Sequence, residues 1–396
     1  MFDMEARRII EALRSGVPSR AVGHYFSEAR PQIMRDIAEQ MEAVTSDGVS
    51  RGRIFSGKYG EGKTHLLNTV YGMAHADQKV VSYLSISKES PIDKLYLIYQ
   101  KVVQNTYLPG REQPGFERIF EEMSPNSPLA NEMLAYAAKE LETDKLYYVL
   151  RAYLNTDDPE EKFQLISDME GDFIGNPVLR RIYRRIFNTA VKFNVNFSKT
   201  KHSMDYFKFI SHLFSQCGYN GWVLLFDEAE LIGRFGKKAR QKCYRNIAAF
   251  LAPQERLENT FSLFAISSSY VEDVIDGKHE FDNLMETFPD DPKPGENVLN
   301  AIIKAPQLLP LTKEEIAHTV ERMCEFHGKA YDWTPGVSTE EILKATRAGG
   351  YLLRTQIRAA IEYLDQTYQY GAAGETQIEE LSKESFEEVP SLEDVL

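Results

Sequence analysis

The chain has 396 residues, of which 43% are hydrophobic and 27% are charged, a composition typical of globular proteins. This length predicts one large domain with a smaller one, or a core with a large insertion. The formal net charge of −13 argues against a broad surface that coats nucleic acid, although it leaves room for a local basic face.

Three cysteines, Cys217, Cys243 and Cys324, are scattered without CxxC spacing or paired histidines. Their spacing argues against a structural zinc site or a disulfide framework and fits a reducing cytosol. The N-terminal segment has charges within its apolar face and no small-residue cleavage site, which predicts an amphipathic helix and not a signal peptide. No uncharged apolar run approaches membrane-spanning length. We therefore expect a soluble, cytoplasmic protein without membrane contact.

The first 50 residues predict helices, because Ile9, Ile10 and Leu13 form an apolar face and residues 33–44 repeat the helical spacing. Two β-branched or apolar runs then flank a helical segment. The expected strands cover residues 53–56 and 80–86, and the expected helix covers residues 64–76. This strand–loop–helix–strand order predicts a parallel α/β unit.

Amphipathic helical sequence without an internal repeat then continues to about residue 219. A stretch of this length between two core strands predicts an insertion, and insertions often carry the particular function of a family. Further strands are expected at 222–226 and 261–266, with a short apolar stretch at 308–311. Helices are expected at 313–328, 339–348 and 353–368. The predicted division is an N-terminal helical segment (1–50), an α/β core (51–312) with a helical insertion (88–220), a helical lid (313–370) and an acidic tail (371–396).

The loop between the first strand and the first core helix has the Walker A spacing of a P-loop. Its residues are Gly57, Lys58, Tyr59, Gly60, Glu61, Gly62, Lys63 and Thr64, followed by His65. Glycines let backbone N–H groups turn toward phosphates, and the helix that begins at Lys63 directs its positive dipole end at them. We expect Lys63 to reach the β- and γ-phosphates of ATP and Thr64 to place its hydroxyl on Mg²⁺. We include His65 in the binding loop, although it suits helix packing better than catalysis.

The strand at 223–226 ends in two carboxylates, Asp227 and Glu228, the Walker B pattern. Asp227 is expected to hold Mg²⁺, directly or through water. Glu228 is expected to orient and deprotonate the attacking water, which would make hydrolysis possible. Strands that end in solvated acids are common, so this interpretation depends on the Walker A loop upstream.

Two further residues are candidates for sensing the γ-phosphate. Ser268, with Ser269 next, follows a strand expected to lie between the Walker A and Walker B strands, which is the sensor 1 arrangement. Arg354 opens the last helix after Gly349 and Gly350 and suits the sensor 2 role. A serine-rich turn and a solvated basic face remain the alternative interpretations.

Two basic clusters, residues 180–185 and 234–245, interrupt an otherwise acidic sequence. Either cluster fits contacts with nucleic-acid phosphates or with an acidic partner. Solvated helix faces explain both clusters equally well.

These motifs, in this order, resemble an AAA+ P-loop ATPase of the origin-recognition and initiator-like branch. Residues 9–20 (IIEALRSGVPSR), the P-loop in the form GKYGEGKTHLL and the lid helix with Gly-Gly and arginines are similar to the BrxD-like ATP-binding proteins of bacterial phage-exclusion (BREX) loci. The resemblance covers nearly the whole chain outside the middle of the insertion. Its P-loop is shared by very many ATPases, so residues 9–20 are the more specific part.

The resemblance implies an ATPase that works in a multi-protein defence system, as a motor, loader or switch on DNA or on partner proteins. It implies that Lys63 and Thr64 bind phosphate and magnesium, that Asp227 binds magnesium, that Glu228 is the base and that Arg354 is sensor 2. The implied partners are other defence proteins, DNA directly or through a partner, and further copies of the chain.

The missing arginine finger, one of two departures from the family pattern, favours an alternative, whereas the intact Glu228 favours hydrolysis. Residues 271–321 contain no arginine where many oligomeric relatives carry an arginine finger, and no helix-turn-helix module is evident after the lid. A finger would have to come from a partner or from elsewhere in the chain, such as Arg234, Arg240, Arg245, Arg256 or Lys278. The alternative is a nucleotide-gated interaction module that hydrolyses ATP slowly or not at all and docks effector proteins.

Overall fold

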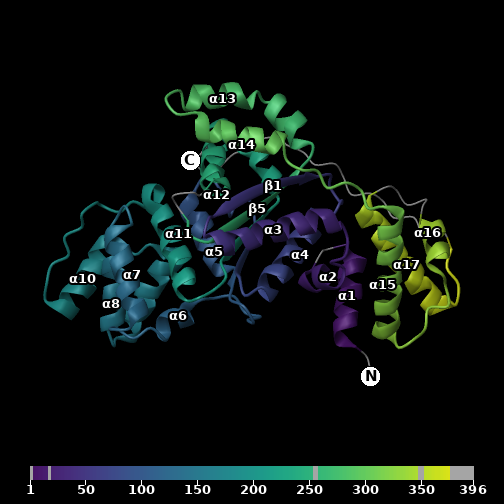
Figure 1. Ribbon diagram of the computed structural model, residues 1–396, viewed down its shortest axis with the longest axis horizontal. Coiled ribbons are helices and arrows are strands. Elements are labelled where there is room, and N and C mark those ends of the chain that lie inside the picture. Colours follow the sequence, from purple (N-terminus) through teal and green to yellow (C-terminus); the bar gives the residue numbers. More distant parts are fainter. Residues whose placement is uncertain (1–2, 17–18, 253–256, 347–351, 375–396) are drawn as a thin grey trace.

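A five-stranded sheet crosses the centre of the molecule (Figure 1), with strand order β1-β5-β4-β2-β3. Its strands are β1 (Arg51–Gly57), β2 (Val80–Ser85), β3 (Thr106–Tyr107), β4 (Trp222–Asp227) and β5 (Thr260–Ser267). All neighbouring strands are parallel except β2 and β3, which are antiparallel. The computed structural model describes residues 3–16, 19–252, 257–346 and 352–374.

Both faces of the sheet are buried, which explains why β4 and β5 are nearly continuous apolar runs. One face packs against α3 (Pro31–Asp47) and α4 (Lys63–Ala76). Side chains of the opposite parity, such as Leu224 and Phe264, join a larger core with helices that follow β2 and β4. The expected parallel α/β core is therefore confirmed.

Strand β5 lies between the P-loop strand β1 and the strand β4 that ends in Asp227, as the sequence predicts. The apolar stretch at 308–311 does not form a strand. Instead, a single parallel bridge joins Ser56 to Gln307, and the Leu308 N–H donates to the carbonyl of Ser56 at 2.7 Å. The chain thus touches the free edge of β1 before it enters the lid.

The expected insertion is helical, and α6, α7, α8 and α10 gather at one end of the molecule, on the left in Figure 1. Its helices are α5 (Leu95–Gln104), α6 (Glu117–Glu121), α7 (Pro128–Lys139), α8 (Lys145–Asn155), α9 (Pro159–Ser167), η1 (Asp168–Asp172), α10 (Asn176–Phe187) and α11 (Lys199–Gln216). A fully buried ion pair joins Lys145 to Asp168 at 2.7 Å, and the Tyr206 hydroxyl donates to the same carboxylate. The short strand β3 within this region was not foreseen.

Helices α12 (Lys237–Leu251), α13 (Glu280–Thr287) and α14 (Lys293–Ile303) lie on the upper side of the sheet in Figure 1. Two shorter helical segments, η2 (Ala229–Arg234) and η3 (Val271–Asp276), directly follow β4 and β5. The three expected lid helices follow as α15 (Lys313–Tyr331), α16 (Thr339–Thr346) and α17 (Leu353–Tyr370). Thr312 and Glu315 form a reciprocal capping box that fixes the start of α15.

The N-terminal helices α1 (Met4–Ser15) and α2 (Arg20–Tyr25) do not form a unit of their own. Apolar residues of α1 share a core with the lid helices, and Arg14 forms an ion pair with Asp365 of α17 at 2.7 Å. In contrast, α3 packs on the sheet. The segment predicted as residues 1–50 is therefore divided between the lid and the α/β core.

Some sequence expectations lie outside the described residues. They concern Gly349 and Gly350 before the last helix, Arg256 as a source of an arginine finger, and the acidic tail from residue 375 onward.

Candidate nucleotide-binding site

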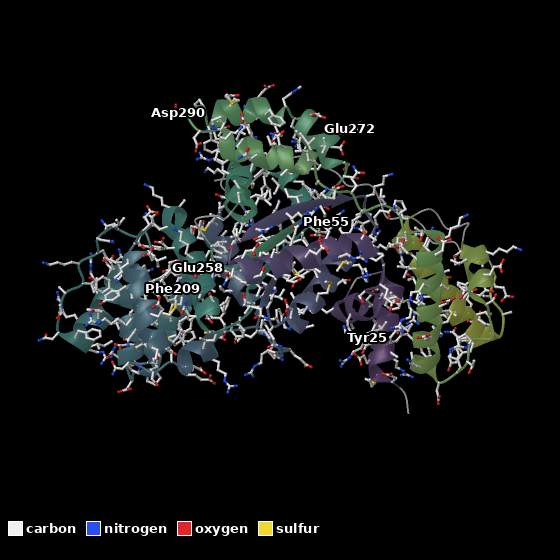
Figure 2. The ribbon with its side chains drawn as sticks, in the orientation of Figure 1. Tyr25, Phe55, Phe209, Glu258, Glu272 and Asp290 are labelled. Atoms are coloured by element: carbon white, nitrogen blue, oxygen red, sulfur yellow. The ribbon has the colours of Figure 1, made fainter. Side chains whose placement is uncertain are left out.

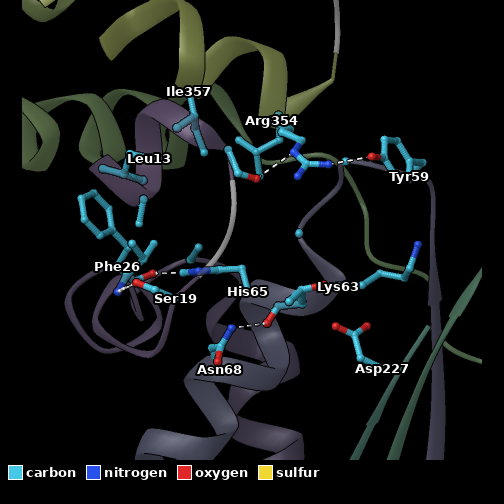
Figure 3. Close-up of a pocket in the computed structure, with 18 of the residues that line it drawn as sticks. Leu13, Ser19, Phe26, Tyr59, Lys63, His65, Asn68, Asp227, Arg354 and Ile357 are labelled. Atoms are coloured by element: carbon cyan, nitrogen blue, oxygen red, sulfur yellow. Dashed lines mark hydrogen bonds between the residues drawn. The ribbon is translucent and has the colours of Figure 1, made fainter. Parts of the chain in front are cut away.

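A cavity of about 650 Å³ opens where α1, α2, the P-loop, the tips of β2 and β4, and α17 meet. Figure 3 shows Lys63 and Asp227 on one side of it and Leu13, Phe26 and Ile357 on the other. The cavity therefore has a charged region beside the P-loop and an apolar region between the N-terminal helices and the lid. This combination suits a ligand with a phosphate group at one end and a planar apolar group at the other.

The P-loop has the backbone geometry that its sequence predicts. Gly60 and Gly62 adopt φ angles of 78° and 91°, a left-handed conformation that glycine adopts without steric cost. Helix α4 begins at Lys63, and no side chain caps its N-terminus, so its first backbone N–H groups remain available to an anion. The Lys63 Nζ donates to the carbonyl of Gly57 at 3.2 Å.

The predicted loop residues divide into two groups. Those that line the cavity are Tyr59, Gly60, Gly62, Lys63, Thr64 and His65. Gly57, Lys58 and Glu61 are not part of the lining: the Lys58 side chain is exposed and Glu61 is buried. The Nε2 of His65 donates to the Phe26 carbonyl at 3.0 Å, and burial lowers the pKa of this imidazole. His65 therefore anchors α2 to α4 in addition to lining the cavity.

Arg30, which the sequence analysis did not select, holds the outer side of the P-loop. Its guanidinium donates to the backbone carbonyls of Glu61 at 2.7 Å and of Leu309 at 3.2 Å. The backbone N–H of Arg30 donates to the carboxylate of Glu315 on α15. Burial lowers the pKa of Arg30 and raises that of Glu61, while the opposite charge of each group counteracts the shift of the other. One buried arginine therefore connects the P-loop, the chain before the lid, and the lid itself.

Asp227 and Glu228 both line the cavity at the carboxyl end of β4. Asp227 is buried and accepts a hydrogen bond from the Tyr83 hydroxyl at 2.7 Å. Burial, together with the charge of Asp227, raises the pKa of Tyr83 far above its ordinary value, so the phenol stays protonated and donates. Glu228 is exposed and has a φ of 55°, a left-handed conformation that costs a non-glycine residue energy and is common at functional sites.

Glu230 is the main side chain of the cavity that the sequence analysis missed. It is buried on η2, and its Oε1 lies 3.6 Å from the Nζ of Lys63. Its other oxygen accepts a hydrogen bond from the backbone N–H of Ser267 at 3.1 Å. Glu230 thus joins the P-loop lysine to the tip of β5.

The structure does not bring Ser268 to the cavity surface. Its backbone N–H donates to the carbonyl of Gly57 at 3.1 Å, and the neighbouring hydroxyls of Ser267 and Ser269 contact each other. The tip of β5 is therefore attached to the P-loop by its backbone, and the sensor 1 role of Ser268 stays a prediction.

Arg354 lines the cavity from α17. Its guanidinium donates to the Gly16 carbonyl and to the Tyr59 hydroxyl, each at 2.7 Å, and Figure 3 shows the contact with Tyr59 above the cavity. A single lid arginine therefore joins the end of α1 to the P-loop.

The strand order, the P-loop at the start of α4, the carboxylates at the end of β4 and the helical lid define a P-loop nucleotide-binding protein with AAA+-like architecture. The family model described as "BREX system ATP-binding protein BrxC/D" matches residues 3–380. The chain belongs to this family of ATP-binding proteins of a defence system.

Other comparisons add less. No curated protein matches the sequence. Among solved structures, a Walker-type ATPase of Pyrococcus abyssi is similar at 14% sequence identity and a TM-score of 0.35, with 84% of this chain and 69% of that chain covered. Among the described residues, no helix has the length and apolar character needed to cross a membrane.

Proposed function

We propose that this protein hydrolyses ATP with magnesium and that hydrolysis drives a motor, loading or switching step in a BREX defence complex. The observation that carries the proposal is the exposed carboxylate of Glu228, which lines the same cavity as Lys63 and directly follows Asp227. A protein that only stored ATP would not need a second, solvent-facing acid at this place.

In this proposal, Lys63 and the N-terminal N–H groups of α4 hold the phosphates. Thr64 and Asp227 both line the cavity and would supply the hydroxyl and carboxylate that suit a magnesium ion bound mainly by phosphates and water. No cluster of three or more potential metal-ligating side chains occurs in the described ranges, and a P-loop site does not require one. Magnesium would supply positive charge that neutralises the phosphates.

Glu228 is assigned the role of general base. Its side chain is exposed and lines the cavity, whereas Asp227 and Glu230 are buried. Of the three acids, Glu228 is therefore the one placed to accept a proton from an attacking water molecule.

Phosphate release by the purified protein tests the proposal, with magnesium and ATP and with or without duplex DNA. We expect turnover that requires magnesium. Absence of turnover in both conditions, with ATP binding intact, would favour the alternative module that binds ATP and docks partners without hydrolysis.

The module that binds ATP without hydrolysis was favoured by the missing arginine finger, so the source of positive charge near the γ-phosphate matters for choosing between the two functions. Three of the suggested sources of an arginine finger are engaged within the chain: Arg240 is buried against Glu280, Arg245 forms an ion pair with Asp291, and Lys278 donates to the carbonyl of Gly233. Arg20, Arg30 and Arg354 line the cavity from within the same chain. We therefore infer that this chain provides arginine charge in cis and depends less on a neighbouring copy.

The Glu230→Gln variant is expected to bind ATP about tenfold more tightly, a change of about 1.4 kcal/mol. The phosphates of ATP must displace Glu230 from Lys63, and a neutral glutamine competes less strongly for the ammonium group while it keeps the shape of the side chain. Titration with a fluorescent ATP analogue measures the change. An unchanged or lower affinity would show that Glu230 does not restrain Lys63.

The Arg354→Ala variant is expected to weaken ATP binding about 10- to 100-fold, because a charged hydrogen bond contributes about 1.5–3 kcal/mol. Arg358 provides a matched control: it donates to the carbonyl of Arg14 and also ties α17 to α1, but it does not line the cavity. Equal losses of ATP affinity in Arg354→Ala and Arg358→Ala would show that Arg354 only connects α17 to α1 and does not contact the nucleotide.

A further inference from the structure

The segment from residue 173 to residue 204 has an unusual charge balance. It contains no Asp or Glu, although the whole chain has 59 of them. Its basic residues are Arg180, Arg181, Arg184, Arg185, Lys192, Lys199 and Lys201. A chain this acidic would place several acids in a segment of this length by composition alone, so the segment is a local reversal of the overall charge.

Four of these residues form one face of α10, which we name the α10 surface: Arg180, Arg181, Arg184 and Arg185. All four are exposed, while Leu179, Ile182 and Tyr183 on the other side of the helix are buried. Residues three or four positions apart are neighbours on a helix surface, so Arg180 with Arg184, Arg181 with Arg184, and Arg181 with Arg185 lie next to each other. Helix α10 therefore exposes four neighbouring guanidinium groups to solvent.

The members of the α10 surface differ in their contacts. Arg185 forms an ion pair with Glu161, and Arg180 lies over the ring of Phe193, 5.2 Å from its centre. Arg181 and Arg184 form no ion pair with any acid in the described part of the chain. These two arginines therefore carry charge that the fold itself does not neutralise.

The second basic cluster, on α12, is neutralised to a larger extent. Lys237 pairs with Glu286, Arg240 with the buried Glu280, and Arg245 with Asp291. The acids come from α13 and the turn that follows it, so this cluster mainly attaches α12 to its neighbours. The structure therefore distinguishes two clusters that the sequence left equivalent.

The α10 surface lies at the outer end of the insertion, far from the lid helices α15 to α17 (Figure 1). The nucleotide cavity is lined by α1, α2, the P-loop and α17, so the arginines of α10 are remote from it. Their role must be separate from that of the arginines that line the cavity.

We propose that the α10 surface binds the phosphate backbone of double-stranded DNA without reading its sequence. Guanidinium groups donate paired hydrogen bonds to phosphate oxygens, and contacts to phosphate alone fix position but not sequence. A rigid helix face suits the regular phosphates of a duplex, while the nearby ring of Phe193 is covered by Arg180 and is not offered for stacking on single-stranded bases. This inference rests on the proposed function as an ATPase of a BREX defence complex and names the surface that would contact DNA.

The double variant Arg181→Ala/Arg184→Ala of the full chain tests the proposal. Binding of a fluorescently labelled duplex of mixed sequence is measured by anisotropy over a series of salt concentrations. We expect about tenfold weaker binding at low salt. The slope of log affinity against log salt should become shallower by about 1.8, because each lost phosphate contact removes about 0.9.

The matched control is Lys238→Ala/Lys242→Ala, which removes the same charge from two exposed residues one turn apart on α12. This control should keep the salt slope of the unmodified protein. An equal change in both double variants, or no change in Arg181→Ala/Arg184→Ala, would overturn the proposal. So would the absence of duplex binding by the unmodified protein at low salt.

Polyglutamate at equal charge concentration serves as the competitor that represents an acidic protein. Failure of polyglutamate to displace the labelled duplex supports DNA as the partner, whereas displacement equal to that by unlabelled duplex would overturn it. ATP turnover with and without duplex DNA is measured on the same samples. Its absence in both conditions would contradict the proposed ATPase function alone, because binding at the α10 surface is read out independently.

Discussion

Replacing Lys63 with alanine is expected to abolish measurable ATP binding. Lys63 lines the cavity and is the first residue of α4, so its ammonium group lies at the helix N-terminus where the phosphates are proposed to bind. Charged hydrogen bonds to two phosphates together contribute about 3 kcal/mol or more, which corresponds to a loss of affinity of about 100-fold or more. Titration of the purified variant with a fluorescent ATP analogue gives the measurement.

The interpretation requires a folded variant, because Lys63→Ala also leaves the buried carboxylate of Glu230 without its ion-pair partner. Thermal unfolding and circular dichroism establish whether the variant is folded. Lys88→Ala is a suitable control, since Lys88 is exposed and outside the cavity. A folded Lys63→Ala variant with unchanged ATP affinity would refute the assignment of the site.

Replacing Glu228 with glutamine is expected to preserve ATP affinity and to lower the turnover rate about 100- to 10,000-fold, the usual contribution of a general base. Glutamine has the shape of glutamate but cannot accept the proton of the attacking water. The exposed position of Glu228 makes a large effect on folding unexpected. Steady-state phosphate release and equilibrium ATP binding, measured on the same preparation, separate the two effects.

Glu272→Gln provides the control for Glu228→Gln, because Glu272 is an exposed acid on η3 outside the cavity (Figure 2). Its turnover should equal that of the unmodified protein. Normal turnover in Glu228→Gln would show that another group takes the proton, and weaker ATP binding in that variant would indicate a role in holding the nucleotide.

The parts of the site that depend on local sequence were predictable. The positions of the P-loop and of the acids after β4 follow from the order of strand, turn and helix, since each motif occupies one continuous segment whose backbone geometry its own residues favour. The roles assigned to these residues stay predictions. The position of β5 between β1 and β4 was likewise confirmed, because the motifs at the strand ends indicate which strands are neighbours.

The parts that depend on distant contacts were not predictable. Glu230 meets Lys63, Tyr83 meets Asp227, and Arg30 meets Glu61 only after the sheet and the N-terminal helices assemble. Spacing along the chain contains no signal for such pairs. Only Glu230 had a weak signal in the sequence, because it lies two residues after Glu228, the second acid of the Walker B pattern. Ser268 illustrates a different difficulty: the sequence predicts where β5 ends, but none of the three serines at this end lines the cavity.

The shared core of α1 and the lid has a consequence for how fast the cavity can close. Leu13 of α1 and Ile357 of α17 line one side of the cavity, and Lys63 and Asp227 line the other. The chain joins these two sides twice, once between α1 and α3 and once between α14 and α15. Two short covalent links keep the sides at a high effective concentration. If they separate to exchange nucleotide, their return is therefore an intramolecular step whose rate does not depend on the concentration of the protein.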